Sequence, residues 1–183
     1  NQGTILFGSW DGHIYALDCS NGALRWKYRT NGAISASPVI GNSNAYVGSG
    51  DGIMYALSIT DGTLKWKADL SSGALHSSPA LSLDGKTVYV ASWTGSLFAL
   101  SDEKSGDVVW STSLGATKIE SSPVLSSELE LIYIGTYEGK LYAIHVSNGT
   151  TLWTHTSEKE RPIVSTPAVS NMKRIVYVAS KGS

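Results

Sequence analysis

Several features that would each indicate a class of function are scarce in this sequence. Cys19 is the only cysteine among 183 residues, so no internal disulfide can form. Cysteine usage therefore does not indicate whether the protein works in a reducing or an oxidising compartment. The 14 basic and 15 acidic side chains nearly balance and form no basic stripe, which gives no electrostatic reason to expect nucleic acid. No apolar run reaches the roughly 18 residues that a membrane-spanning helix needs. We therefore expect neither a nucleic-acid partner nor a membrane span.

Signals of catalysis are also scarce. The sequence has no Gly-x-Ser-x-Gly nucleophile motif, and its glycines lie in turns rather than in a phosphate-binding loop. The histidines, which fall at different phases of the repeat described next and so argue against a cluster, are His13, His76, His145 and His155. We predict no catalytic residue, no metal site and no cofactor, and we lean against an enzyme.

What the sequence does contain is an internal repeat, visible in three residue types. The tryptophans at 26, 66, 110 and 153 are 40, 44 and 43 residues apart. The prolines at 38, 79, 123 and 167 are 41, 44 and 44 apart, and the glycines at 12, 52, 95, 139 and 182 are 40, 43, 44 and 43 apart. Chance does not explain three markers with one period, so the chain is a repeat protein.

Each period has the pattern of short strands. A run such as Ile132–Ile134 ends in small residues, a glycine turn follows, and a second run such as Tyr142–Ile144 leads by another turn to the tryptophan strand. No window keeps a helical period. Four antiparallel strands in each period form a sheet that must bury both faces, and radial stacking of such sheets does so. We predict an all-β fold, a β-propeller of four-stranded antiparallel blades with about four blades.

A stack of parallel coils with the same period is the competing architecture. Tight Asp-Gly and Asn-Gly turns favour hairpins and argue against it.

One segment of the repeat carries a family resemblance. Ala16 through Gly22 to Trp26 resembles the tryptophan-docking motif of pyrroloquinoline-quinone-like (PQQ-like, quinoprotein-type) β-propeller repeats, and four copies cover essentially the whole chain. The third copy has one extra residue before its glycine. The resemblance implies that each tryptophan packs flat between neighbouring blades, and that each glycine admits a neighbouring backbone. The structural docking residues are then Trp26, Trp66, Trp110, Trp153, Gly22, Gly62, Gly106 and Gly149.

The resemblance also sets expectations for the domain and its surroundings. We expect one domain over residues 1–183, with blades at about 1–34, 35–74, 75–118 and 119–162 and a partial blade at 163–183. Since the family usually closes with seven or eight blades, we expect a partial or half propeller. A longer parent chain is the favoured way to complete the ring. A homodimer and a four-bladed ring closed by the terminal strands stay open. A periplasmic or extracellular location is slightly favoured.

The family name raises the question of quinone-dependent oxidation. Dehydrogenases of this fold carry two adjacent cysteines and a calcium ion beside the cofactor, whereas this chain has Cys19 alone. Calcium needs six to eight oxygen ligands, and Glu120 is the only acidic residue that we place near the channel mouth. A complete dehydrogenase is therefore not expected, and a fragment of one is kept as an alternative.

Two positions vary between copies and are therefore free to serve binding. The tip before the turn glycine reads Trp10, Gly50, Trp93, Tyr137 and Lys181. The position three residues before the proline, where we expect the innermost strand to begin, reads Ser35, His76, Glu120 and Val164. Exposed aromatic residues are typical binding anchors. The predicted binding face, which includes Lys118 because it lies close to Glu120 in sequence, consists of Trp10, Trp93, Tyr137, His76, Glu120 and Lys118.

The functional prediction follows from the scarcity of catalytic and metal-binding motifs. We expect a non-catalytic scaffold for protein–protein interaction or assembly, with a protein partner. A fragment of a PQQ-dependent dehydrogenase and a propeller that binds glycans or small molecules are the alternatives. The alternative for the binding face is a purely structural role, in which its aromatic rings cover neighbouring blades and its polar residues are solvated loop residues.

Overall fold

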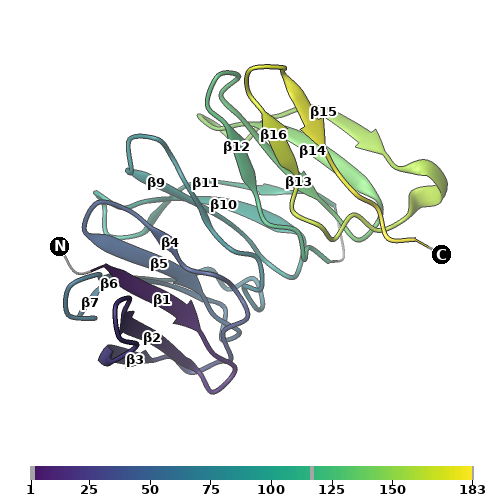
Figure 1. Cartoon of the computed structure of the whole chain (residues 1–183). Coiled ribbons are helices and arrows are strands. Elements are labelled where there is room, and N and C mark those ends of the chain that lie inside the picture. Colours follow the sequence, from purple (N-terminus) through teal and green to yellow (C-terminus); the bar gives the residue numbers. More distant parts are fainter. Residues whose placement is uncertain (1–2, 116–117, 183) are drawn as a thin grey trace.

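A computed structural model describes residues 3–115 and 118–182, which form five antiparallel sheets. The sheets follow one another in chain order, so the two termini lie at opposite ends of the stack (Figure 1). The first sheet has three strands, the next three sheets have four each, and the last has two. This arrangement confirms an all-β propeller fold of four-stranded antiparallel blades, which is not closed into a ring by these sheets.

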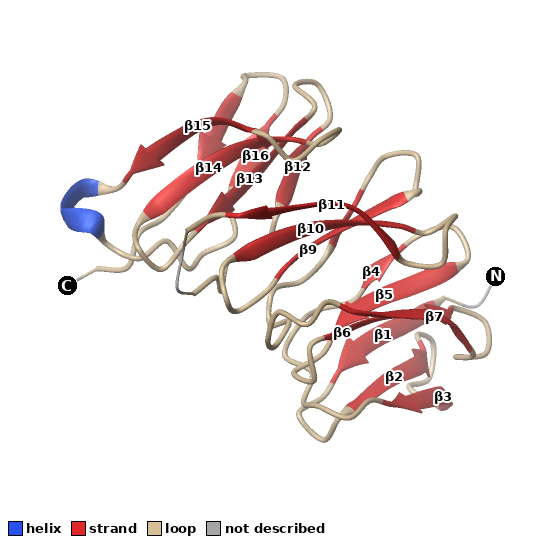
Figure 2. Cartoon of the chain, turned by 180° about the vertical axis from the view of Figure 1, so that it is seen from behind, coloured by secondary structure: helices blue, strands red, loops and turns tan. Residues whose placement is uncertain are grey.

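The strand bounds repeat from sheet to sheet. The first sheet contains β1 (Thr4–Gly8), β2 (His13–Asp18) and β3 (Leu24–Arg29). The second contains β4 (Val39–Ile40), β5 (Asn44–Gly48), β6 (Ile53–Ser58) and β7 (Leu64–Asp69). The third contains β8 (Ala80–Leu81), β9 (Thr87–Ala91), β10 (Ser96–Ser101) and β11 (Asp107–Ser113). The fourth contains β12 (Val124–Ser126), β13 (Leu131–Gly135), β14 (Lys140–His145) and β15 (Thr151–Thr156). The fifth contains β16 (Ala168–Ser170) and β17 (Ile175–Tyr177) and is preceded by a single 3-10 turn, η1 (Glu158–Glu160) (Figure 2).

A hydrophobic core lies between each pair of consecutive sheets. In β5, Tyr46 packs in the core shared with the third sheet, whereas Val47 packs in the core shared with the first. Successive side chains of a strand point to opposite faces, so the central strands are buried on both sides. That burial explains why they are continuous apolar runs. In the outer strand β7, by contrast, Trp66 is the only buried residue.

The innermost strands begin later than the sequence suggested. They start at Val39, Ala80, Val124 and Ala168, one residue after each repeat proline. Since proline has no N–H to contribute to a ladder, pairing starts beyond it. The expectation that Ser35 and its equivalents begin these strands is therefore wrong by four residues. These positions lie in the connecting segment ahead of each strand.

The serine or threonine before each proline links neighbouring blades. The amide of Ser37 donates to the Ser78 hydroxyl at 2.9 Å, and the amide of Ser78 donates to the Ser122 hydroxyl at 2.9 Å. The amide of Ser122 continues the series to the hydroxyl of Thr166 at 3.4 Å. This ladder gives the recurrent Ser-Pro and Thr-Pro dipeptides a structural role. Within the described residues, no helix is long and apolar enough to cross a membrane.

Candidate functional site

The motif tryptophans of the first, second and third sheets each contact the following sheet. The indole N–H of Trp26 donates to the carbonyl of Ile59 at 3.0 Å, and that of Trp110 donates to the carbonyl of Val146 at 3.0 Å. A Cβ added to Gly62 would lie 2.6 Å from the ring of Trp26. Gly62 also has a φ of +72°, a region that side chains disfavour. The next blade therefore supplies both an acceptor and a flat surface for the indole.

At the second sheet the acceptor is a side chain instead. The indole N–H of Trp66 donates to Oδ1 of Asp102 at 2.7 Å, and Nδ2 of Asn44 lies 3.3 Å from the same oxygen. Asp102 stands one residue after β10, where the other copies have Ile59 and Val146. Burial, together with the adjacent Asp102 carboxylate, raises the pKa of the Tyr46 hydroxyl. The sequence analysis did not identify Asp102. The one extra residue in the third copy of the motif, which contains Asp102, was a sign that this copy differs from the others.

The two ends of the stack carry unmatched members of the motif. The Trp153 indole is part of a residue that is 38% exposed, and its ring lies 5.8 Å from that of Tyr133 in its own sheet. A Cβ added to Gly22 would meet no described atom within 4 Å. Among the described residues, no glycine of a following blade packs against the Trp153 ring, and no indole of a preceding blade packs against Gly22.

The tips are the turns β5–β6, β9–β10 and β13–β14, together with the equivalent turn β1–β2 of the three-stranded first sheet. The first three of these are each fixed to the segment ahead of the innermost strand of their own blade. The amide of Trp93 donates to the carbonyl of Ala74 at 2.8 Å, and the amide of Tyr137 donates to that of Lys118 at 3.1 Å. The amide of Gly50 makes the same bond to Ala33 at 2.9 Å. These repeated bonds bring the two positions singled out in the sequence next to each other.

Five of the six residues predicted for the binding face are in contact. The His76 and Trp93 rings meet edge to face at 4.8 Å. The Lys118 ammonium lies 4.1 Å from the ring centre of Trp93 and 4.7 Å from that of Tyr137. It also forms an ion pair of 2.6 Å with the Glu120 carboxylate. We call these five residues, His76, Trp93, Lys118, Glu120 and Tyr137, the tip cluster.

The tip cluster joins three blades. Lys118 precedes the fourth sheet but reaches the tip of the third, so its ammonium lies between aromatic rings of two consecutive blades. On the other side, Nδ1 of His76 is 2.8 Å from the hydroxyl of Ser35, which precedes the second sheet. Neighbouring blades thus hold these side chains in place on a surface where Tyr137 remains 39% exposed.

Trp10 stands apart from this group. It is 82% exposed and lines a cavity of about 260 Å³ with Arg29 and Asn31. Among the described residues, no ring contact, ion pair or hydrogen bond joins Trp10 to the tip cluster. Gly50 occupies the tip between Trp10 and Trp93 and offers no side chain to bridge the two.

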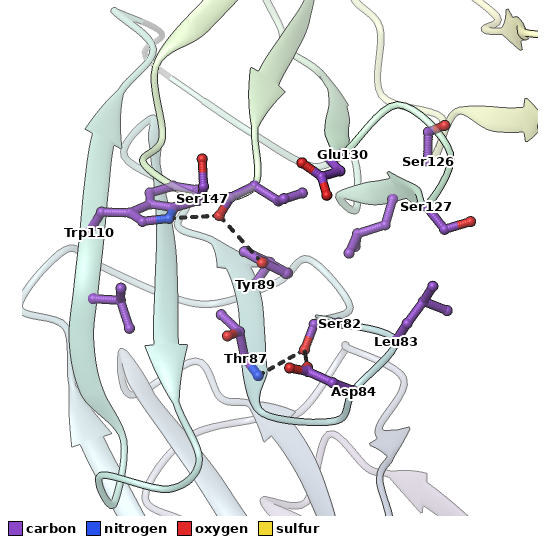
Figure 3. A pocket seen from close by; sticks show the side chains of 13 residues that line it. Ser82, Leu83, Asp84, Thr87, Tyr89, Trp110, Ser126, Ser127, Glu130 and Ser147 are labelled. Atoms are coloured by element: carbon purple, nitrogen blue, oxygen red, sulfur yellow. Dashed lines mark hydrogen bonds between the residues drawn. The ribbon is translucent and has the colours of Figure 1, made fainter.

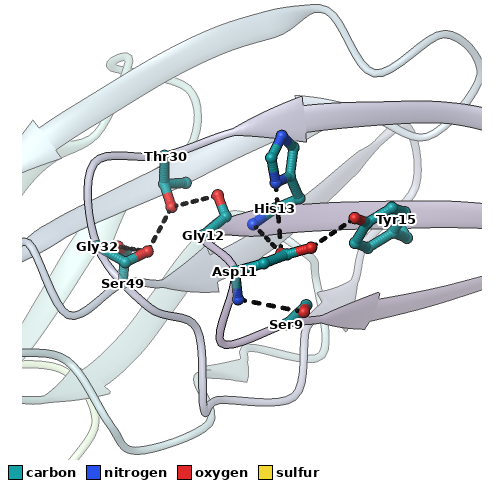
Figure 4. Close-up of polar contacts among 8 residues, drawn as sticks. All are labelled: Ser9, Asp11, Gly12, His13, Tyr15, Thr30, Gly32 and Ser49. Atoms are coloured by element: carbon teal, nitrogen blue, oxygen red, sulfur yellow. Dashed lines mark hydrogen bonds and ion pairs between the residues drawn. The ribbon is translucent and has the colours of Figure 1, made fainter.

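A carboxylate organises the tip that carries Trp10. Oδ1 of Asp11 accepts the His13 amide at 2.9 Å, and Oδ2 accepts the Tyr15 hydroxyl at 2.6 Å (Figure 4). The bond from Tyr15, with further bonds from His13 and Ser9, lowers the pKa of Asp11 to about 2. Asp51 accepts the Tyr55 hydroxyl in the same way at 2.8 Å. These aspartates fix the shape of the turns.

No group of three or more His, Cys, Asp or Glu side chains that could hold a metal ion occurs within residues 3–115 and 118–182.

Comparisons with known proteins agree with this architecture. A PQQ-like repeat model described as outer membrane protein assembly factor BamB matches residues 1–183. No curated protein matches. The crystal structure of BamB from Moraxella catarrhalis superimposes with a TM-score of 0.81 at 23% identity, covering 97% of this chain and 55% of that protein. The chain thus spans about half the length of that relative and shares its fold. On the family match over all its residues, the chain belongs to the PQQ-like repeat family of outer membrane protein assembly factor BamB.

Proposed function

We propose that this chain is a non-catalytic β-propeller scaffold in protein assembly, and that the tip cluster is the surface that a protein partner contacts. The family match supports a role in assembly, since the model that covers the chain is named for an assembly factor. The contact of Lys118 with two aromatic rings is the observation that carries the choice of surface.

The chemistry of the tip cluster suits protein recognition. Tryptophan and tyrosine are enriched among the residues that contribute most to binding at protein interfaces. In this chain Trp93 and Tyr137 flank a cation whose position is fixed by the Glu120 carboxylate. A partner would therefore bind side chains that are already ordered, and the entropic cost of fixing them on binding would be small.

Site-specific photo-crosslinking in the cells that make the protein tests this proposal. A photoreactive phenylalanine replaces Tyr137 in one variant and Met172 in the control, which is 96% exposed. Because consecutive strands are antiparallel, Met172, in the turn between β16 and β17, lies at the opposite edge of its sheet from the tips. We expect a discrete crosslinked protein from position 137 and none of that mass from position 172.

The captured protein is then purified and its binding measured directly. We expect Trp93→Ala and Tyr137→Ala to weaken binding by about tenfold or more, and Met172→Ala to leave it unchanged. Thermal melting of each variant separates loss of binding from loss of folding. Identical crosslinks from both positions, or alanine variants that are folded and bind as tightly as the parent, would contradict the proposal. Capture of a glycan instead of a protein would favour the carbohydrate alternative.

A further inference from the structure

The turns β4–β5, β8–β9, β12–β13 and β16–β17, here called the rear turns, lie at the opposite edge of the sheets from the tips. Polar side chains connect the rear turns of the fourth and fifth sheets. Arg174 donates from Nε and Nη2 to one oxygen of Glu128 at 3.0 and 2.8 Å, and Asn171 accepts from the Ser126 hydroxyl at 2.9 Å. A guanidinium and an amide thus bridge these two neighbouring blades.

The second and third sheets are bridged near the same edge. The Asn44 amide lies 3.3 Å from the Asp102 carboxylate across the boundary between the sheets. The equivalent positions between the third and fourth sheets are Thr87 and Val146, which cannot form this amide–carboxylate pair. The rear turn of the third sheet, residues 82–86, is also two residues longer than residues 41–43 in the second.

A cavity of about 370 Å³ lies between the third and fourth sheets at this point. Asp84 and Glu130 border it from the rear turns of the two sheets, on opposite sides of its open centre (Figure 3). Val109 and Leu125 contribute apolar surface to the lining, which contains no lysine, arginine or histidine among the described residues. The volume falls in the range of about 300–1,000 Å³ that is common for small-ligand sites.

We propose that this cavity binds an alkylguanidinium group, the side chain of an arginine residue of a partner protein. The aliphatic part would pack on Val109 and Leu125, and the guanidinium would donate to Asp84 and Glu130. An arginine side chain combines an apolar stem with a planar set of donors that suits carboxylates. The Arg174–Glu128 pair one blade further on is an internal precedent for a guanidinium that bridges rear turns.

The Asp84 carboxylate is already oriented for this role. Its Oδ1 accepts the Ser82 hydroxyl at 2.6 Å (Figure 3). The same oxygen accepts the Lys86 amide at 3.1 Å. The nearby Lys86 ammonium is paired with Glu103 at 2.8 Å. Neither Lys86 nor Glu103 lines the cavity, so the charged side chains of the lining are those of Asp84 and Glu130, and both are acidic. A lining that combines two carboxylates with apolar side chains such as Val109 and Leu125 does not suit calcium, which takes six to eight oxygen ligands.

The test is an NMR titration of the ¹⁵N-labelled chain with Nα-acetyl-arginine amide. We expect saturable shifts of the Trp110 indole and of the Leu125 and Val146 amides. The neutral isostere Nα-acetyl-citrulline amide should bind at least tenfold more weakly. The double variant Asp84→Asn/Glu130→Gln should weaken arginine binding at least tenfold, whereas Glu158→Gln/Glu160→Gln, with the same change of charge on the exposed η1 turn, should not. Agmatine, a free alkylguanidinium, tests whether the site prefers an unattached cation.

Three results would overturn the inference. They are equal binding of citrulline and arginine probes, shifts that map away from the cavity, and unchanged binding by the folded Asp84→Asn/Glu130→Gln variant. Tighter binding of agmatine would overturn the assignment to a partner's side chain. Because the rear turns and the tip cluster lie at opposite edges of the sheets, each can fail independently of the other.

Discussion

Trp66 and Trp153 occupy the same position in two copies of one motif, yet their surroundings differ. Trp66 is 7% exposed, with Gly106 of the next blade against its ring and Asp102 as acceptor for its indole N–H. Trp153 is 38% exposed and has no such glycine among the described residues. The motif therefore specifies a surface for docking, and the following blade supplies the burial. A residue's energetic role depends on its neighbour as much as on its own repeat.

The largest expected difference is between alanine substitutions at these two tryptophans. Trp66→Ala should lower the free energy of unfolding by about 3–5 kcal/mol, as for other buried aromatic residues. Trp153→Ala should cost less than half as much, because less buried surface is lost. Urea denaturation monitored by circular dichroism measures both. Equal losses would show that the next blade contributes little.

The motif glycines, against which the indoles dock, allow the same comparison between a docked and an undocked copy. Gly62 and Gly22 have the same φ of +72°, but only Gly62 lies against an indole. Gly22→Ala should cost about 1–2 kcal/mol from backbone strain alone. Gly62→Ala adds a steric conflict with Trp26 and should cost about 1–3 kcal/mol more, in the range of other overpacked sites. Equal unfolding free energies for the two variants would refute the close approach of the ring.

The acceptor of the Trp66 indole provides a third test. Asp102→Ala leaves a buried N–H without its partner and should cost about 1–3 kcal/mol. The neighbouring Glu103 forms only an exposed ion pair with Lys86, so Glu103→Ala should change the unfolding free energy by less than about 1 kcal/mol. If the two variants are equally stable, Asp102 has no special role in the dock.

Smaller effects are expected in the tip cluster. Lys118→Gln removes the cation between Trp93 and Tyr137 and should cost about 0.5–1 kcal/mol, typical of exposed cation–π contacts. The same substitution at Lys65, which lies on the exposed side of β7, is the control and should have no measurable effect. Urea denaturation measures both variants, and equal unfolding free energies for Lys118→Gln and Lys65→Gln would argue against the contact.

The smallest effect concerns pH at the first tip. Tyr15→Phe removes the main hydrogen bond that lowers the pKa of Asp11, so this pKa should rise from about 2 toward the ordinary 3.8. Because the folded-state pKa is depressed, the stabilisation by the ionised carboxylate is complete above the ordinary pKa and is lost as pH falls through about 2. Carboxyl NMR titrations of the parent and the variant measure the shift. An Asp11 pKa that is the same in the parent and in Tyr15→Phe would show that the Tyr15 hydroxyl does not cause the depression of this pKa.

Much of the fold could be predicted because each repeat contains the local sequence signals of its own turns and strands. Turn glycines, strand runs and the Ser-Pro or Thr-Pro dipeptides each recur with one period, and the structure forms its sheets accordingly. The start of the innermost strands was misplaced, because the apolar pattern does not show that pairing waits until after the proline. Lys118 and Glu120 lie two residues apart in the sequence and form an ion pair, but the contact of Lys118 with Trp93 depends on the approach of the neighbouring blade.

Other features depend on contacts that no single repeat contains. Trp10 resembled Trp93 in sequence, yet Gly50 between them leaves no side chain to join the first tip to the tip cluster. The role of Asp102 depends on an indole 36 residues earlier in the chain. The cavity beside Asp84 arises where a longer turn and the pair Thr87 and Val146 replace the residues that bridge the preceding boundary.

Hydrogen exchange of the indole N–H groups tests the central claim most directly, namely that the motif indoles of the first three sheets dock on the next blade. Assigned by single Trp→Phe variants, the indole signals of Trp26, Trp66 and Trp110 should exchange slowly, because each N–H is bonded across a blade boundary. Those of Trp10 and Trp153 should exchange rapidly. If the Trp66 indole exchanges as fast as that of Trp10, the blades are not held together in this way.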